Sequence, residues 1–182
     1  MLSIEKWYHI KMSKLQKMIP KSETGGREMS GPALRQLSSH QSIHDGYYTE
    51  GRDLTELLVS LFNEQRLDDC REVSKALVEH WETRMIAHAD AEEEGFYLEV
   101  MGKYPELETQ LTKLVRDHEL LRLVVADVKE CIQQEGMTLR VIDLFKGILL
   151  LVEIHSREEE KHLFIHEHLR ELHDHDELKN LG

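Results

Sequence analysis

The feature that most constrains the fold is a ten-residue pattern that the chain contains twice. In each copy a histidine is followed four residues later by the first of two glutamates, and then by two large apolar residues. The copies are His88-Ala-Asp-Ala-Glu92-Glu93-Glu94-Gly-Phe96-Tyr97 and His155-Ser-Arg-Glu-Glu159-Glu160-Lys-His-Leu163-Phe164. Residues four apart lie on one face of a helix. Each copy therefore predicts a helix that presents an imidazole and a carboxylate together, as one half of a site for a pair of metal ions.

Composition favours a single helical domain. The chain has 182 residues with only 3 prolines and 10 glycines, and Leu, Glu, Lys and Arg dominate it, as in long helices. The net charge of -12 argues against nucleic acid as a partner. Cys70 and Cys131 are the two cysteines, and neither has the neighbours of a zinc or redox motif. No apolar run approaches the roughly 18 residues of a membrane span and no secretion signal is recognisable, so we expect a soluble, cytoplasmic protein.

Composition shifts divide the chain into three parts. Residues 1–31 are net basic and end in glycine-rich sequence, which predicts a tail or a short amphipathic helix that docks on the domain or on a protein partner. Residues 32–176 hold the sustained helical periodicity, and residues 177–182 form a C-terminal tail. We expect a monomer or a dimer.

Within 32–176 the apolar residues recur at helical spacing in four stretches. The first runs from Pro32 to 63–66, the second from Asp68 to just before Gly102, the third from 107 to 132, and the fourth from Thr138, as N-cap, through 163. Short connections make neighbouring helices antiparallel. The predicted fold is all-α, an up-down-up-down four-helix bundle.

Each predicted helix carries a histidine on its apolar stripe, and these histidines lie at similar distances from the intervening turns. With the two glutamates they give six candidate metal ligands: His44, His88, Glu92, His118, His155 and Glu159. His40 could replace or join His44 but fits the common level about one helical turn less well. Six ligands imply two ions bridged by the carboxylates; a single ion, and buried His–Glu ion pairs without metal, are the alternatives. The donors suit iron, manganese or zinc.

These residues resemble the hemerythrin-like (HHE cation-binding) family over residues 35–172. The resemblance rests on His44 or His40, on His88 with Glu92 and Glu93, on Asp117-His118-Glu119, and on His155 with Glu159 and Glu160. It implies a non-haem di-iron centre with two bridging carboxylates and an oxo or hydroxo bridge. Oxygen-carrying members have two histidines four apart on the third helix, where this chain has Leu114 and Arg122 on either side of His118. The expected count is therefore four histidines rather than five, as in branches linked to peroxide, nitric oxide or iron-centre repair.

The implied function is binding or reduction of a small ligand, O2, NO or peroxide, in sensing, detoxification, the stress response or iron handling; redox catalysis is left open. The alternative is a non-enzymatic helical interaction module stabilised by metal, such as zinc, that docks through residues 1–31. Four aromatic residues are candidates to surround the metal ligands: Tyr47, Tyr48, Trp81 and Tyr97. The histidines at 162–175 are interpreted as a solvated helix end.

Overall fold

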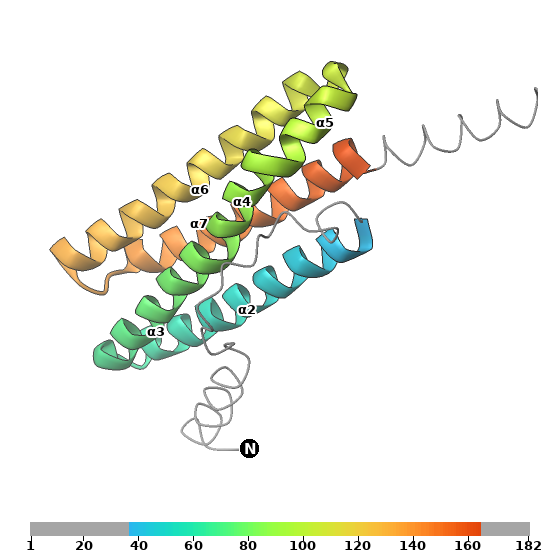
Figure 1. The fold of residues 1–182 in the computed structure, drawn as a ribbon. Coiled ribbons are helices and arrows are strands. Elements are labelled where there is room, and N and C mark those ends of the chain that lie inside the picture. Colours follow the sequence, from blue (N-terminus) through green and yellow to red (C-terminus); the bar gives the residue numbers. More distant parts are fainter. Residues whose placement is uncertain (1–36, 165–182) are drawn as a thin grey trace, which may run out of the picture.

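Four helical segments, packed antiparallel, make up the part of the chain that the computed structural model describes, residues 37–164 (Figure 1). The all-α, up-down-up-down prediction is confirmed. The predicted N-terminal segment 1–31 and the C-terminal tail 177–182 lie outside the described residues, as do Pro32 and the histidines after His162.

The four segments follow the predicted ranges closely. The first is α2 (Leu37–Asn63). The second is continuous but changes its winding, from α3 (Leu67–His80) through η2 (Trp81–Ile86), α4 (Ala87–Ala91) and η3 (Glu92–Phe96) to α5 (Tyr97–Lys103). The third is a 3₁₀ turn, η4 (Pro105–Leu107), followed by α6 (Glu108–Glu135), and the fourth is α7 (Leu139–Glu159) followed by η5 (Glu160–Phe164). The segments η2, η3 and η5 are π-helical.

The turns that join the segments use residues suited to them. Gly136, at φ 74°, ends α6 in a conformation that glycine adopts without strain. Thr138 stands at the N-cap of α7 as predicted, with extended backbone, but its hydroxyl makes no capping bond. The backbone carbonyl of Thr138 accepts instead from the N–H groups of Val141 and Ile142, at 3.1 and 3.4 Å.

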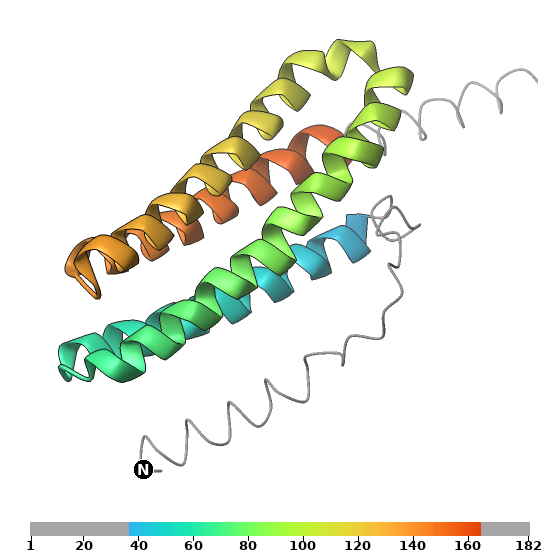
Figure 2. The same ribbon diagram turned by 60° about the vertical axis from the view of Figure 1, so that its left-hand side comes forward.

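Two apolar clusters fill the bundle and leave a polar layer between them. The larger cluster occupies the end with the α2–α3 and α6–α7 turns and contains Leu58, Trp81 and Phe145. The smaller surrounds the α5–α6 connection and includes Phe96 and Leu111. Along each of the last three segments the predicted ligands come between residues of the two clusters, so apolar layers separate them from solvent at both ends. Figure 2 shows α6 and α7 paired along their lengths, with α3 beside α2.

One glycine is required by the packing of the larger cluster. A Cβ added to Gly51 would lie 2.4 Å from two ring carbons of Trp81, which is 1% exposed. α2 and the second segment therefore approach each other closely on the side of the polar layer where the larger cluster lies. Both cysteines are buried free thiols. Among the described residues, no helix is both long and apolar enough to cross a membrane.

Candidate metal centre

The polar layer gathers seven side chains from all four helical segments. None is more than 2% exposed. They are His40 and His44 of α2, His88 of α4, Glu92 at the start of η3, His118 of α6, and His155 and Glu159 of α7. All six predicted ligands are therefore brought together, and a seventh residue joins them.

The imidazoles face each other in pairs across neighbouring segments. Nε2 of His44 is 2.9 Å from Nε2 of His88, and Nε2 of His118 is 3.1 Å from Nε2 of His155. Two nitrogen ligands about 2.1 Å from one ion, at right angles, are about 3.0 Å apart. The two pairs therefore have the spacing of neighbouring ligands on a common ion.

Glu92 lies among four imidazoles without a well-formed hydrogen bond. Its Oε1 is 2.8 Å from Nε2 of His88 and 3.2 Å from that of His40, and its Oε2 is 3.4 Å from Nε2 of His118. Neither oxygen has a hydrogen-bond partner of acceptable geometry among the described residues. Buried carboxylates without such partners are costly. Close donor atoms that do not bond to one another are instead typical of ligands that point toward a shared ion.

Glu159 occupies the same layer but has firm partners. Nε2 of His40 is 2.7 Å from its Oε2, and the hydroxyl of Tyr97 donates to its Oε1 at 2.8 Å. Nε2 of His44 and of His155 lie 3.7 and 3.8 Å from Oε2. The two glutamates are thus both central, but only Glu159 is held by hydrogen bonds.

Two overlapping sets of ligand atoms within the layer could each hold a metal ion, with the atoms of a set within 4.8 Å of one another. One set is His40, His44, His88 and Glu92, and the other is His44, Glu92, His155 and Glu159. His118 is in neither set, although it is adjacent to His155 and Glu92.

The expected count of four histidines left open whether His40 joins His44, and in the structure both reach the layer. Along the bundle axis, His40 is displaced by one helical turn from the level of the other predicted histidines. In antiparallel helices a residue four before His44 lies level with one four after His88, which is Glu92. His40 therefore adds a fifth imidazole at the level of the carboxylates. Counting residues from the turn to Glu92, rather than to His88, predicts this position for His40.

Both copies of the duplicated pattern change to π-helical winding at the glutamates. η3 begins at Glu92, and η5 begins directly after Glu159. π-helical turns shift the side chains that follow relative to an α-helix and are frequent at functional sites. The duplication in sequence is thus matched by a duplication in backbone geometry that periodicity did not predict.

The outer nitrogens of the imidazoles differ between the two halves of the centre. Nδ1 of His118 donates to Oε1 of Glu93 at 2.8 Å, and Arg122 donates to the same oxygen at 3.0 Å. This bond directs the unprotonated Nε2 of His118 into the layer. Nδ1 of His155 lies 3.8 Å from Oδ2 of Asp117.

On the opposite side, Nδ1 of His44 and of His88 have no hydrogen-bond partner within residues 37–164. Of the four imidazoles in the two pairs, only that of His118 is therefore oriented by a hydrogen bond to a carboxylate, since Nδ1 of His155 also lacks a hydrogen-bond partner in this part of the chain.

From the sequence, Arg122 had no predicted role beyond pairing with one of the many glutamates, and in the structure it pairs with Glu93. A residue four after His118 lies on the same helix face, and this spacing was the available signal for a place beside the centre.

Burial determines most of the protonation states. It lowers the pKa of His44 well below its usual value, that of His88 to about 4 and that of His118 to about 2. The pKa of His40 is raised because its bond to Glu159 and the nearby carboxylate charges outweigh burial. Three imidazoles are consequently neutral near pH 7, the form that binds metal.

The pKa values of the two buried carboxyl groups shift in opposite directions. Burial, together with the charge of Glu159, raises the pKa of Glu92 well above its usual value. The pKa of Glu159 is lowered, because the bond to His40 and the positive charge of the imidazoles overcome burial. Glu159 is therefore the carboxylate that stays ionised.

The predicted aromatic neighbours divide into two groups. Tyr97 is stacked on His118, with ring centroids 5.8 Å apart and an interplanar angle of 5°, and the Tyr47 ring is 5.9 Å from that of His88. Trp81 packs instead against His80. His80, a buried histidine outside the centre, bonds through Nε2 to the carbonyl of Tyr47 at 2.9 Å, so its role is structural.

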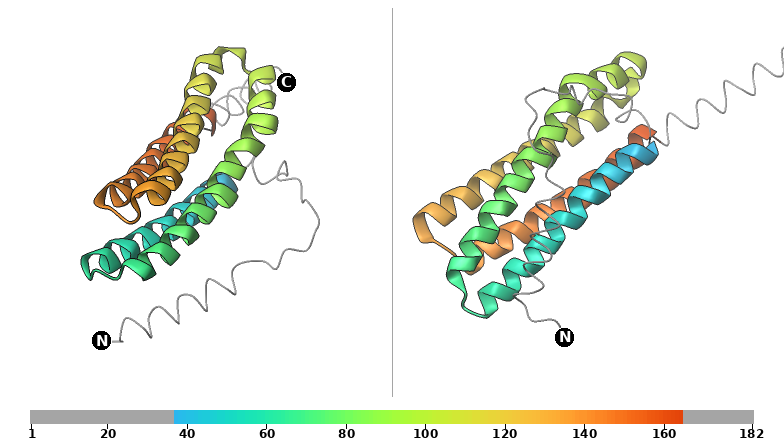
Figure 3. Two further views of the ribbon diagram at one scale, coloured as in Figure 1. Left: turned by 90° about the vertical axis from the view of Figure 1, so that its left-hand side faces the viewer. Right: turned by 60° about the horizontal axis from the view of Figure 1, so that its bottom comes forward.

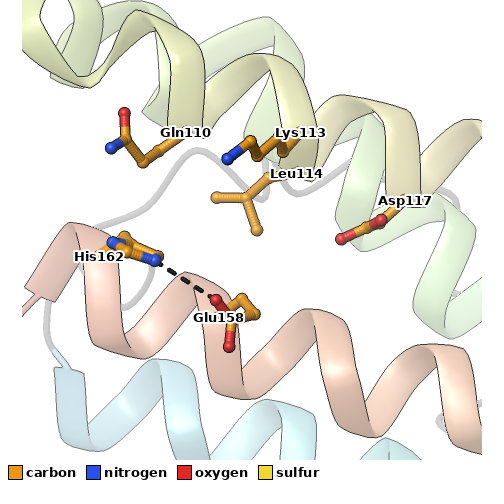
Figure 4. Close-up of a pocket in the computed structure, with 6 residues that line it drawn as sticks. All are labelled: Gln110, Lys113, Leu114, Asp117, Glu158 and His162. Carbon is orange, nitrogen blue, oxygen red and sulfur yellow. Dashed lines mark ion pairs between the residues drawn. The ribbon is translucent and has the colours of Figure 1, made fainter.

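Two pockets of similar size flank the centre. One, of about 290 Å³, lies between α6 and the end of α7 (Figure 4). It is lined by Gln110, Lys113, Leu114, Asp117, Glu158 and His162. In Figure 4, Nε2 of His162 points to Glu158, at 3.3 Å. The other, of about 300 Å³, lies between α2 and α7 and includes His44.

Comparisons with protein-family models, with curated proteins and with solved structures gave no match. The chain is thus a helical protein with buried His/Glu clusters that could bind metal, and its resemblance to the hemerythrin-like family rests on the ligand residues alone.

Proposed function

We propose that this protein is a non-haem di-iron protein of hemerythrin-like type that binds or reduces a small ligand, O2, NO or peroxide, in sensing, detoxification or iron handling. The observation that supports it best is the convergence of five imidazoles and two carboxylates in one fully buried layer. A structural zinc site needs only four ligands. Seven suit two ions with higher coordination numbers.

The distances suggest how the ligands divide. His40, His44 and His88 would hold one ion, since their ligand atoms lie within 4.8 Å of one another. His118 and His155 would hold the other, since their Nε2 atoms are 3.1 Å apart. Glu92 and Glu159 lie between the groups and would bridge the ions. The unbonded oxygens of Glu92 fit this role, because they are otherwise buried without compensation.

The bound iron would supply open coordination positions and reversible electron transfer, and the surrounding residues would control both. Apolar layers on either side keep bulk water away. The hydroxyl of Tyr97 holds a proton 2.8 Å from Oε1 of Glu159, where it is available to a ligand that accepts one. Glu93 keeps the Nε2 of His118 unprotonated.

The fifth imidazole changes one part of the sequence-based interpretation. A count of four histidines favoured redox chemistry over reversible oxygen binding, because it left more coordination positions open. With His40 included that reason is lost, so both binding and reduction belong to the proposal.

Metal analysis after anaerobic titration with Fe²⁺ tests the proposal directly. We expect two iron ions per chain and, after exposure to air, near-ultraviolet absorption from an oxygen bridge between ferric ions. Addition of NO or peroxide to the reduced protein should change the visible spectrum. Protein that takes up no iron, or one ion without these absorptions, would rule out the di-iron assignment.

The alternative, a zinc-stabilised interaction module, predicts a different outcome of the same titration. Zinc would bind with one ion per chain and be retained in competition with iron. Deletion of residues 1–31 would then remove partner binding without changing the metal content.

A further inference from the structure

The pocket between α2 and α7 reaches a proposed ligand from the surface. Figure 3 shows the start of α2 beside the end of α7. The pocket is lined by His44, Asp45 and Tyr48 from α2, and by Glu153, Ser156, Arg157 and Glu160 from the fourth segment. His44 is 2% exposed. The wall of this pocket is therefore also part of the buried polar layer.

The lining carries an excess of negative charge. Three carboxylates, Asp45, Glu153 and Glu160, face one arginine. Asp45 and Glu153 are exposed and form no hydrogen bond or ion pair with other residues of 37–164. Within residues 37–164 their charges are consequently not neutralised, and they attract cations.

Two buried polar atoms in the lining have no partner. Nδ1 of His44 and Oγ of Ser156 are both inaccessible to solvent and lack a hydrogen bond within the described residues. Buried polar groups are normally satisfied. Unsatisfied atoms on residues of an acidic pocket indicate that polar species pass through or bind there.

The pocket on the other side of α7 provides a contrast. Its charged residues are two carboxylates and one lysine (Figure 4). Glu158 is paired with Lys161 and His162. No proposed ligand lines that pocket, so it offers a cation neither unpaired carboxylates nor a direct contact with the centre.

From these observations we propose that the α2–α7 pocket is the route by which a divalent metal cation reaches the buried centre. Asp45 and Glu153 attract the hydrated ion, and His44 is the first ligand that it meets. A volume of about 300 Å³ accommodates an ion with several of its waters, since each water occupies about 30 Å³. The inference rests on the metal centre of the proposed function and adds the path to it.

The test is the rate of Fe²⁺ uptake by metal-free, full-length protein under anaerobic conditions. Aliquots are quenched with a coloured chelator at short times, and the unbound iron is measured. Asp45→Asn and Glu153→Gln should each slow uptake by about threefold at low ionic strength, because each removes one charge near the path of a dication. The double variant should be about tenfold slower, and salt should reduce these differences.

Glu158→Gln is the matched control, because it removes a carboxylate from the same helix but from the other pocket. It should take up iron at the wild-type rate, and the wild type and all four variants should reach the same final stoichiometry. Equal rates for every variant, or equal slowing by Glu158→Gln, would overturn the access route while leaving the metal centre intact. Failure of the wild type to bind iron would instead overturn the centre, and the route with it.

Discussion

Replacing Glu92 with glutamine should stabilise the metal-free protein while impairing metal binding. The carboxylate is fully buried, neither oxygen makes a well-formed hydrogen bond within the described residues, and burial raises its pKa. A carboxyl group whose pKa is raised on folding costs stability above its unfolded pKa, by about 1.4 kcal/mol for each unit of the shift. Glutamine has nearly the same shape and carries no charge, so this cost disappears.

The gain in unfolding free energy can be estimated from the contacts of the Glu92 side chain. The new amide nitrogen can donate to Nε2 of His88, which lies 2.8 Å from Oε1 in the wild type. Relief of a buried, poorly satisfied polar group amounts to about 1–3 kcal/mol. For a chain of 182 residues, about 2 kcal/mol corresponds to a rise in Tm of roughly 4–8 °C.

Glu159→Gln is the matched variant, and its effect should have the opposite sign. The amide oxygen can still accept from the protonated Nε2 of His40, which now meets a carboxylate oxygen at 2.7 Å. The negative charge that stabilises the protonated imidazole is lost, and a charge-assisted bond becomes a bond to a neutral acceptor. We expect the metal-free protein to lose about 2–3 kcal/mol.

Thermal and urea unfolding of the chelator-treated proteins at pH 8 would measure both changes, and iron titration would measure binding. Glu92→Gln should retain at most one iron ion, because the carboxylate proposed to bridge the two ions is replaced by a neutral amide. A lower Tm for metal-free Glu92→Gln, or two ions retained by it, would refute the reasoning that this carboxylate is kept for a ligand at the expense of stability.

Three further predictions concern the surroundings of the centre. Glu93→Gln should weaken iron binding by about 10- to 100-fold, because the partner that orients His118 becomes a poorer hydrogen-bond acceptor. Competition with a chelator measures the affinity for iron. The control is Glu94→Gln, which changes an exposed neighbour and should bind iron like the wild type. Gly51→Ala should lower the unfolding free energy by about 2 kcal/mol, because its Cβ would meet a buried tryptophan ring at 2.4 Å; an unchanged Tm would contradict the close approach. The metal-free protein should lose stability as the pH falls from about 6.5 toward 4, because the three imidazoles with a lowered pKa outweigh the opposite effect of the raised pKa of Glu92. The folded pKa of His88 is lowered to about 4, so the unfolded chain binds the proton more readily over this range, at about 1.4 kcal/mol per pH unit for such an imidazole. Urea midpoints at pH 7 and pH 5 would reveal this, and equal midpoints would show that the imidazole is not held neutral by burial.

The sequence predicted the helices and the level of the ligands because both follow from periodicity. Apolar steps of three and four residues place the helices, and equal distances from a turn place His44 against His88 and His118 against His155. The structure bears out both pairings, with Nε2 atoms 2.9 and 3.1 Å apart.

What the sequence did not predict depends on local geometry rather than on period. The π-helical turns at the glutamates add a residue to the turn without a recognisable signal. Contacts such as that between Glu93 and His118, or between Tyr97 and Glu159, connect different helices. Helical spacing predicts the helix face on which each residue lies, but not which side chain of another helix it contacts. Many glutamates were therefore equally plausible partners for His118.

The two copies of the duplicated pattern are equivalent in their inner residues but not in their second glutamates. In the first copy, Glu93 turns to α6 and holds His118. In the second, Glu160 turns to α2, accepts a hydrogen bond from Gln41 at 2.8 Å and lines the acidic pocket. The pocket therefore opens on the half of the centre where Nδ1 of His44 has no carboxylate partner. An imidazole whose outer nitrogen has no carboxylate partner can turn to meet an ion more easily than His118, which Glu93 fixes, so we expect this half of the centre to take up an ion first.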